Sequence, residues 1–170
     1  GEVMSIGKTY KEAFQKAIRS LETGRYGLGF AKDYNEKSKE ELLRMLATPS
    51  SDRHFIMYEA LRKGATVDEI FDITKVKHYF VEQMKELVEE EEAIAKSKGS
   101  LPSDEQLISA KKNGFSDKYL SQILAIPEDD IRNKRIELGI EEAWEGVHVS
   151  GTKDSAYYYS TYNADDKNPV

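Results

Sequence analysis

The residues that could do chemistry are few and far apart in the sequence. His54, His78 and His148 are its only imidazoles, and no two stand at the spacing that would bring them together as metal ligands on one helix. The sequence has no cysteine, which excludes a disulfide, a thiolate nucleophile and a thiolate metal site. The lack of cysteine also fits a reducing compartment, and we expect a cytoplasmic protein.

The sequence also gives no evidence for a phosphate-binding site or a cation-binding site. The GxxxxGK[ST] motif is absent, and the glycines of GRYGLGF (24–30) lack the flanking strand and helix that would make them a phosphate cradle. The acidic run Glu89–Glu92 is interpreted as a solvated helix face, because a cation site would need ligands converging from elsewhere. We therefore predict no catalytic, cofactor-binding or metal-binding residue in this chain.

The elements that would have to position a site are repeated along the chain. Placing Gly64 on Gly114 pairs residues 58–76 with residues 108–126 and brings Thr66 onto Ser116. A glycine can adopt the positive φ that ends a helix, and a hydroxyl residue two positions later can cap the next helix. Each half is therefore predicted to be a helix, a glycine stop, a capped short helix, a turn and a second helix.

Helix starts elsewhere carry local signals as well. The capping-box pattern, in which a hydroxyl residue precedes Glu or Gln by three positions, occurs at Thr9–Glu12, Ser38–Glu41 and Ser103–Gln106. Ser51 is expected to cap the helix that runs to Lys63. A long helix from about His78 to Lys96 is predicted to bury one apolar stripe, which consists of Phe80, Met84, Leu87, Val88 and Ile94.

These signals predict an all-α fold of two small helical lobes built on the duplicated unit. The lobes are expected at 38–97 and 103–139, separated by a break at 98–102. An N-terminal helix is expected within 1–23, followed by a loop at 24–37. The segment 140–170 is predicted to be irregular, with its tyrosine-rich part, AYYYSTY (156–162), packed on the domain or on a neighbouring one.

The charge and hydropathy of the sequence indicate which kinds of partner this protein is not expected to bind. The 170 residues carry 31 acidic and 25 basic side chains, a balance that disfavours a polyanion. No apolar run approaches the roughly 20 residues that a membrane-spanning helix needs. A helix-turn-helix reader of DNA would present the first residues of its second helix to the groove. In the second repeat those residues are Glu128, Asp129 and Asp130, which argues against phosphate contact.

Four segments resemble one family in order along the chain. GEVMSIGKTYKEAFQKAIRSLE (1–22) is similar to the end of the first ATP-grasp synthetase unit of the carbamoyl phosphate synthetase large subunit. Residues 42–92 and NGFSDKYLSQIL (113–124) resemble its central helical domain, and AYYYSTYN (156–163) resembles the segment that leads into the second synthetase unit. Residues 140–155 depart from the family pattern, which usually carries a His-Pro and a cysteine there.

The resemblance implies a fragment of a larger ligase that makes carbamoyl phosphate from bicarbonate, glutamine-derived ammonia and two ATP, for arginine and pyrimidine synthesis. ATP and Mg²⁺ or Mn²⁺ would be bound by the flanking synthetase units, with no cofactor in this piece. The implied partners are other large subunits, the flanking units and the glutaminase small subunit, with no nucleic acid or membrane. The implied role is therefore that of a non-catalytic oligomerisation or spacer domain.

Two function classes remain open for the isolated chain. It could be an assembly and spacer module that associates with itself through apolar helix faces. It could instead be an acidic helix-turn-helix module that binds protein or DNA. For self-association, the apolar content is highest in the first lobe, over 51–94. The candidate contact residues there are Phe55, Tyr58, Phe80 and Met84.

Overall fold

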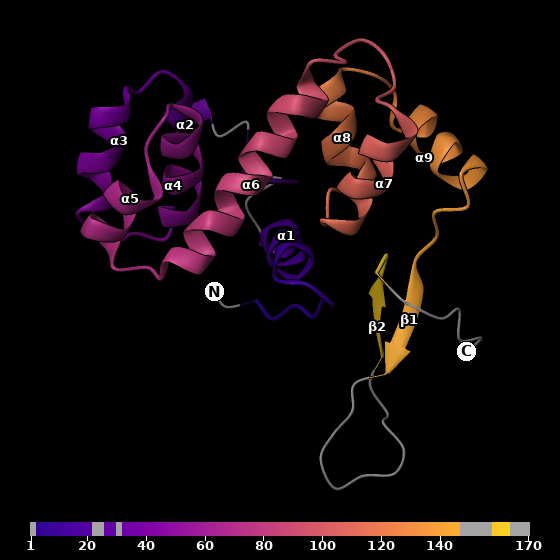
Figure 1. The fold of residues 1–170 in the computed structure, drawn as a ribbon, viewed down its shortest axis with the longest axis horizontal. Helices are drawn as coiled ribbons and strands as arrows, with labels where there is room; N and C mark the ends of the chain where they lie inside the picture. The colour runs from indigo at the N-terminus through magenta and orange to yellow at the C-terminus, as the bar shows by residue number, and fades with distance from the viewer. Residues whose placement is uncertain (1–2, 22–25, 30–31, 147–157, 164–170) are drawn as a thin grey trace, which may run out of the picture.

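The fold is organised around one long helix that passes between two groups of shorter ones (Figure 1). The computed structural model describes residues 3–21, 26–29, 32–146 and 158–163. The long helix is α6 (His78–Ala95), which packs against α4, α5, α8 and α1. On one side of it lie α2 (Lys32–Asn35), α3 (Lys39–Leu46), α4 (Arg53–Arg62) and α5 (Val67–Thr74). On the other lie α7 (Asp104–Lys112), α8 (Asp117–Leu124) and α9 (Glu128–Glu137).

The predicted duplication is confirmed as a repeat of backbone geometry. The first unit is α4, α5 and α6, and the second is α7, α8 and α9. Gly64 and Gly114 have φ values of +92° and +90°, which end the first helix of each unit. The short helices α5 and α8 then end on Lys75 and Ala125, the two non-glycine residues of the described chain with positive φ. Because both pairs keep the same offset of 50 residues, the duplicated unit extends into turns that carry no glycine.

Most of the predicted helix starts are confirmed. Ser38 and Ser103 form complete capping boxes, as does Thr66 in the first unit. Ser116 accepts a hydrogen bond from the backbone N–H of Tyr119. The prediction for Ser51 is wrong, because α4 begins after Asp52 and no side chain caps it.

Regular structure also occurs where loop or irregular chain was predicted. The helical turn α2 lies inside the predicted loop 24–37. In the predicted irregular tail, β1 (Ala143–Gly146) pairs with β2 (Tyr158–Thr161) in an antiparallel ladder that aligns Ala143 with Thr161. The strand β2 contacts α1 (Tyr10–Ser20) through the Thr161 hydroxyl, which donates to Glu12. The predicted packing of the tyrosine-rich segment 156–162 is thus confirmed for residues 158–162, and its first two residues lie outside the described chain.

The hydrophobic core is continuous through both units. The helix α4 is buried almost completely from Phe55 to Leu61, and α6 supplies the face that meets it. The predicted stripe of α6 is one position wrong at its start, because Val81 is buried while Phe80 is 37% exposed. Among the described residues, no helix is long and apolar enough to cross a membrane.

The two glycine stops allow a matched test of backbone strain. We expect Gly64→Ala to lower the free energy of unfolding by about 1–2 kcal/mol, because an L residue is strained at this φ although the space around it is open. Gly114→Ala is expected to cost about 1–3 kcal/mol more, since its Cβ would lie 3.0 Å from the Cα of Glu12. Urea unfolding of both variants measures this, and equal losses would contradict the close packing of α1 on Gly114.

Candidate functional site

The structure separates the four residues predicted to form a contact surface. Phe55, Tyr58 and Met84 are buried in the core of the chain itself, so they cannot touch a second copy while the domain is folded. They were predicted from apolar content, which does not distinguish a core face from a contact face. Phe80 is different, because it remains partly exposed on α6. Its part in self-association stays a prediction.

An exposed aromatic face surrounds Phe80. The centroid of the Phe80 ring lies 4.9 Å from the centroid of the Tyr10 ring on α1 and 5.4 Å from that of the Tyr79 ring. Tyr79 is 54% exposed, and its ring is 6.0 Å from that of Tyr10. These three side chains, here called the aromatic face, present apolar surface to solvent where α1 crosses α6. An ion pair between Lys11 and Glu86, 2.5 Å apart, links the two helices beside it.

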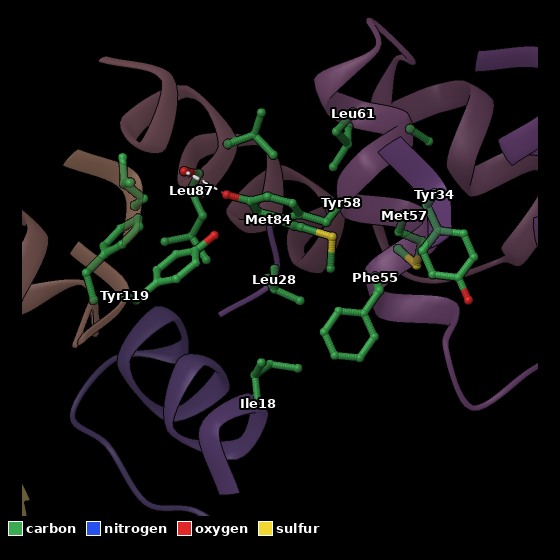
Figure 2. Close-up of a cluster of buried hydrophobic side chains, with 14 of the residues drawn as sticks. Ile18, Leu28, Tyr34, Phe55, Met57, Tyr58, Leu61, Met84, Leu87 and Tyr119 are labelled. Carbon is green, nitrogen blue, oxygen red and sulfur yellow. Dashed lines mark hydrogen bonds between the residues drawn. The ribbon is translucent and has the colours of Figure 1, made fainter. Parts of the chain in front are cut away.

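The most unusual buried group is a carboxylate that sequence reasoning placed in water. Glu91 lies within the acidic run of α6, yet it is 4% exposed. The Tyr58 hydroxyl donates to its Oε2 at 2.9 Å, and the Tyr119 hydroxyl donates to its Oε1. Tyr58 belongs to the first unit and Tyr119 to the second, and Figure 2 shows their side chains approaching one another from opposite sides of the view. Glu91 therefore joins the two units.

The signal for a buried Glu91 was present in the sequence. It stands seven residues after Met84, four after Leu87 and three after Val88, which is the spacing of one helix face. Its acidic type and its acidic neighbours favoured the solvated interpretation. The sequence offered no sign that Tyr58 and Tyr119 would supply hydrogen-bond donors to it.

A glycine-containing loop packs against the same cluster. The N–H of Gly29 donates to the Tyr119 hydroxyl oxygen at 2.8 Å. A Cβ on Gly27 would lie 2.4 Å from the Tyr119 ring, and one on Gly29 would lie 2.6 Å from Glu91 Oε1. Side chains are excluded at both positions, so these glycines allow close packing on the junction. Among the described residues of this loop we find no arrangement that would cradle a phosphate.

Burial shifts the pKa values of all three groups in one direction. Loss of water raises the pKa of Glu91, and the hydrogen bonds from Tyr119 and Tyr58 oppose that rise without cancelling it. Loss of water, together with the neighbouring Glu91 carboxylate, also raises the pKa of Tyr58 and Tyr119 well above the usual value for tyrosine. Both hydroxyls are therefore protonated donors at neutral pH.

A second buried carboxylate anchors the tyrosine-rich strand. Glu12, the last residue of the predicted capping box, is 1% exposed. Thr9 caps α1 as predicted, but the Glu12 carboxylate accepts from the N–H of Lys8 rather than from that of Thr9. It also accepts from the Thr161 hydroxyl at 2.7 Å, the Tyr162 N–H at 3.2 Å and the Asn163 amide at 2.9 Å. The end of β2 is thus held on the first turn of α1.

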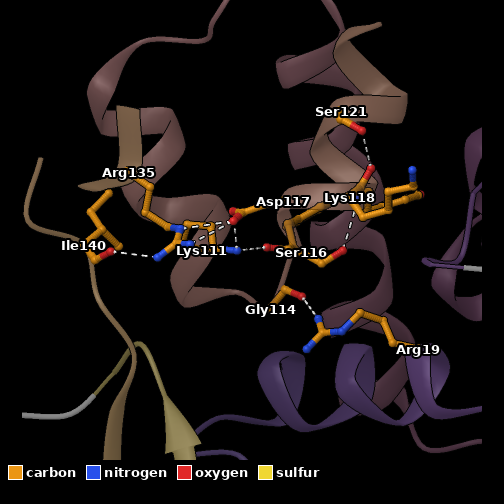
Figure 3. Close-up of polar contacts among 11 residues, drawn as sticks. Arg19, Lys111, Gly114, Ser116, Asp117, Lys118, Ser121, Arg135 and Ile140 are labelled. Carbon is orange, nitrogen blue, oxygen red and sulfur yellow. Dashed lines mark hydrogen bonds and ion pairs between the residues drawn. The ribbon is translucent and has the colours of Figure 1, made fainter. Parts of the chain in front are cut away.

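Charged groups also tie α1 to the second unit and join the helices of that unit to one another (Figure 3). The Arg19 guanidinium donates to the Gly114 carbonyl at 2.5 Å. Asp117 pairs with Lys111 and with Arg135, each at 3.0 Å. Burial alone would raise the pKa of Asp117, but Lys111 and Arg135 outweigh it and hold that pKa below its usual value. In the first unit, 50 residues earlier, the positions equivalent to Lys111 and Asp117 are the apolar Leu61 and Val67, while Arg135 corresponds to Lys85.

One hollow lined by many charged side chains has no excess of either sign. A cavity of about 240 Å³ lies between α1, the first turn of α8 and Tyr162. Its lining combines four cations with four carboxylates, namely Lys16, Arg19, Lys111, Lys118, Glu12, Asp117, Glu128 and Glu142. Because several of these groups already bond to one another or to backbone carbonyls, the cavity is explained as a packed ionic contact.

The histidines are not brought together. The His54 ring packs 5.4 Å from that of Phe14, and burial lowers its pKa. His78 lies 3.0 Å from Asp68 and stacks on Phe71. His148 lies outside the described chain. Within the described residues, no group of three or more histidines and carboxylates is arranged to hold a metal ion.

The fold and its contacts define a class of protein, a helical domain built on a duplicated three-helix unit with an exposed aromatic face. Residues 2–139 match the family model of the carbamoyl-phosphate synthetase large chain, oligomerisation domain. The chain therefore belongs to the carbamoyl-phosphate synthetase large chain family and carries this domain. The structure and the match agree with the resemblance carried by residues 42–92 and 113–124.

Similar proteins cover almost the whole chain. It is 41% identical to the carbamoyl phosphate synthase large chain, N-terminal section, of Aquifex aeolicus, over 95% of this chain and 29% of that protein. It is 38% identical to the corresponding section from Methanopyrus kandleri, over 95% of this chain and 31% of that protein. The arginine-specific large chain of Arabidopsis thaliana, a chloroplastic protein, is 37% identical over 97% of this chain and 14% of its own length. The chain thus spans less than a third of these relatives.

A pair of glutamates that each follow a hydroxyl cap provides a test of the contact between α1 and the end of β2. We expect Glu12→Gln to lower the free energy of unfolding by about 1.5–3 kcal/mol, because a buried carboxylate that accepts four hydrogen bonds is replaced by a single amide oxygen. The matched control, Glu41→Gln, changes an exposed capping-box residue and is expected to cost much less. Thermal unfolding compares them, and an equal loss in both would contradict the anchoring role of Glu12.

Proposed function

We propose that this chain is a non-catalytic oligomerisation and spacer domain of a carbamoyl phosphate synthase large chain. The observation that carries the proposal is the match of residues 2–139 to the oligomerisation domain of that family. The duplicated helical unit and its continuous core support it, because they make a rigid body suited to holding other domains apart. The proposal extends to a cytoplasmic location.

The parent protein is proposed to make carbamoyl phosphate from bicarbonate, glutamine-derived ammonia and ATP. In this proposal ATP and Mg²⁺ or Mn²⁺ bind to synthetase units outside this chain, and a glutaminase small subunit supplies the ammonia. The product would serve arginine or pyrimidine synthesis. The proposal is supported by the relatives, which are named as carbamoyl phosphate synthase large chains, and the Arabidopsis relative is named as arginine-specific.

The surface proposed for self-association is the aromatic face of Tyr10, Tyr79 and Phe80. Exposed aromatic side chains are enriched at protein interfaces, because each buries a large apolar area and loses little side-chain entropy. Phe80 keeps its place from the sequence-based prediction, and Tyr79 is added because it is the more exposed of the two. The alternative, an acidic helix-turn-helix module, is not supported by any basic surface at the start of α9.

The experiment that tests the assembly role is sedimentation of the purified chain over a range of concentrations. We expect a reversible dimer, and Tyr79→Asp is expected to weaken its dissociation constant by about 10–30-fold, as loss of an aromatic anchor does. Tyr158→Asp is the matched control, because Tyr158 is a similarly exposed tyrosine on β2, away from the aromatic face. A chain that stays monomeric at high concentration would refute self-association and leave the spacer role.

The proposed lack of catalysis has a separate test. We expect the purified chain to release no phosphate from ATP in the presence of Mg²⁺, with or without bicarbonate. The assay measures phosphate release by the purified chain and compares it with a buffer blank. Cooperative unfolding of the same sample shows that the chain is folded. Phosphate release that persists through two independent purification schemes would contradict the proposal.

A further inference from the structure

Glu91 occupies the point where three parts of the fold meet. It lies on α6, and the hydroxyls that bind it come from α4 in the first unit and α8 in the second. The backbone N–H of Gly29 reaches the cluster through the Tyr119 hydroxyl. A change in the charge of this carboxyl would therefore be felt by both units and by the loop 26–29.

The cluster can hold an added proton without losing a hydrogen bond. With Glu91 ionised, Tyr58 donates to Oε2. With a proton on Oε2, the carboxyl can donate to the Tyr58 oxygen, and the Tyr58 hydrogen can turn to the Leu87 carbonyl oxygen, which lies 3.5 Å from the hydroxyl (Figure 2). Tyr119 still donates to Oε1 and still accepts from Gly29. Both protonation states therefore satisfy the buried polar groups, as buried sites require.

The charges around Glu91 act in opposite directions, because Arg62 lowers its pKa and Glu59 raises it, so burial is what favours the neutral form. From α4, Glu59 is 3% exposed and faces the cluster together with Arg62, which lies 3.5 Å from it. Two buried carboxylates thus face the same guanidinium. The group facing Glu91 from α8 is the hydroxyl of Tyr119, and the loop contributes the N–H of Gly29. Burying an ionised carboxylate is costly unless its charge is fully compensated.

We propose that Glu91 is a proton-binding site at the junction of the two helical units, and that the domain takes up a proton there when it folds. The proton makes the junction more stable, with the same residues in contact and the direction of the Glu91–Tyr58 hydrogen bond reversed. This inference goes beyond the proposed function, because it concerns how firmly the units are held together and does not require the domain to self-associate.

The sign of the pH dependence follows from linkage. Burial raises the pKa of Glu91 above its ordinary value of 4.5, so the folded protein binds this proton more tightly than the unfolded chain. The stabilisation is fully present below pH 4.5 and is lost as pH rises through the folded pKa. One such proton changes the unfolding equilibrium by up to about tenfold per pH unit.

The test is urea unfolding of the wild-type chain, Glu91→Gln and Glu89→Gln from about pH 5 to about pH 8. Glutamine keeps a donor and an acceptor at the junction and cannot ionise. We expect the wild-type unfolding constant, relative to that of Glu91→Gln, to increase as pH rises across this range, by no more than about tenfold per pH unit. Glu89→Gln removes the same charge from an exposed position on the same helix and should follow the wild type. A wild-type to Glu91→Gln ratio that is constant with pH would overturn the proposal.

A second measurement is independent of whether the Glu91→Gln variant folds. In wild-type chain labelled with ¹³C at the glutamate carboxyl carbons, we expect one resonance to titrate at higher pH than the others. In Tyr58→Phe that resonance should titrate at a different pH, because the partner of Oε2 is removed. If all the folded glutamate resonances titrate together near the ordinary value, the proposal is wrong.

Discussion

The carboxylate of Glu91 is the constraint on which the rest of the structure depends. A buried carboxylate is tolerated only when its oxygens are hydrogen-bonded, and here the donors come from Tyr58 and Tyr119, one from each helical unit. Neither unit can satisfy the group alone, so the two must dock in one relative position. The close approach of Gly27 and Gly29 to the same cluster extends this requirement to the loop 26–29.

The helix α1 acts as a second connector across the molecule. Its apolar side meets α6, where Tyr10 lies against Phe80. Its polar side bonds to backbone carbonyls around the second glycine stop, from Gln15 to Asn113 and from Arg19 to Gly114. Apolar burial supplies most of the free energy of folding, whereas these directional bonds fix orientation. The product is a rigid body whose aromatic face keeps its shape.

The two copies of the helical unit differ at equivalent positions, and the difference matches the residues that pack against each copy. The first unit buries Leu61 in the shared core, while the second places Lys111 at the equivalent position. Lys111 is tolerated because Asp117 and the Phe115 carbonyl bind its ammonium group and the Tyr162 ring covers it at 4.8 Å. The ionic form of the unit thus goes with the presence of Tyr162, the residue directly after β2, which supplies the covering ring.

The sequence by itself determined the local structure. The helix stops at Gly64 and Gly114, most of the caps and the duplication follow from backbone conformations that particular residues prefer, and these act over a few positions. The family could also be recognised from the sequence, because its motifs are short segments that occur in a fixed order along the chain. Only the tertiary structure decided which apolar and charged side chains are buried. Phe80 and Val81 are neighbours on one helix, and Glu91 lies on the same helix face as Met84. Whether each of these side chains is buried depends on which elements pack against α6. That packing is set by contacts between residues far apart in the chain.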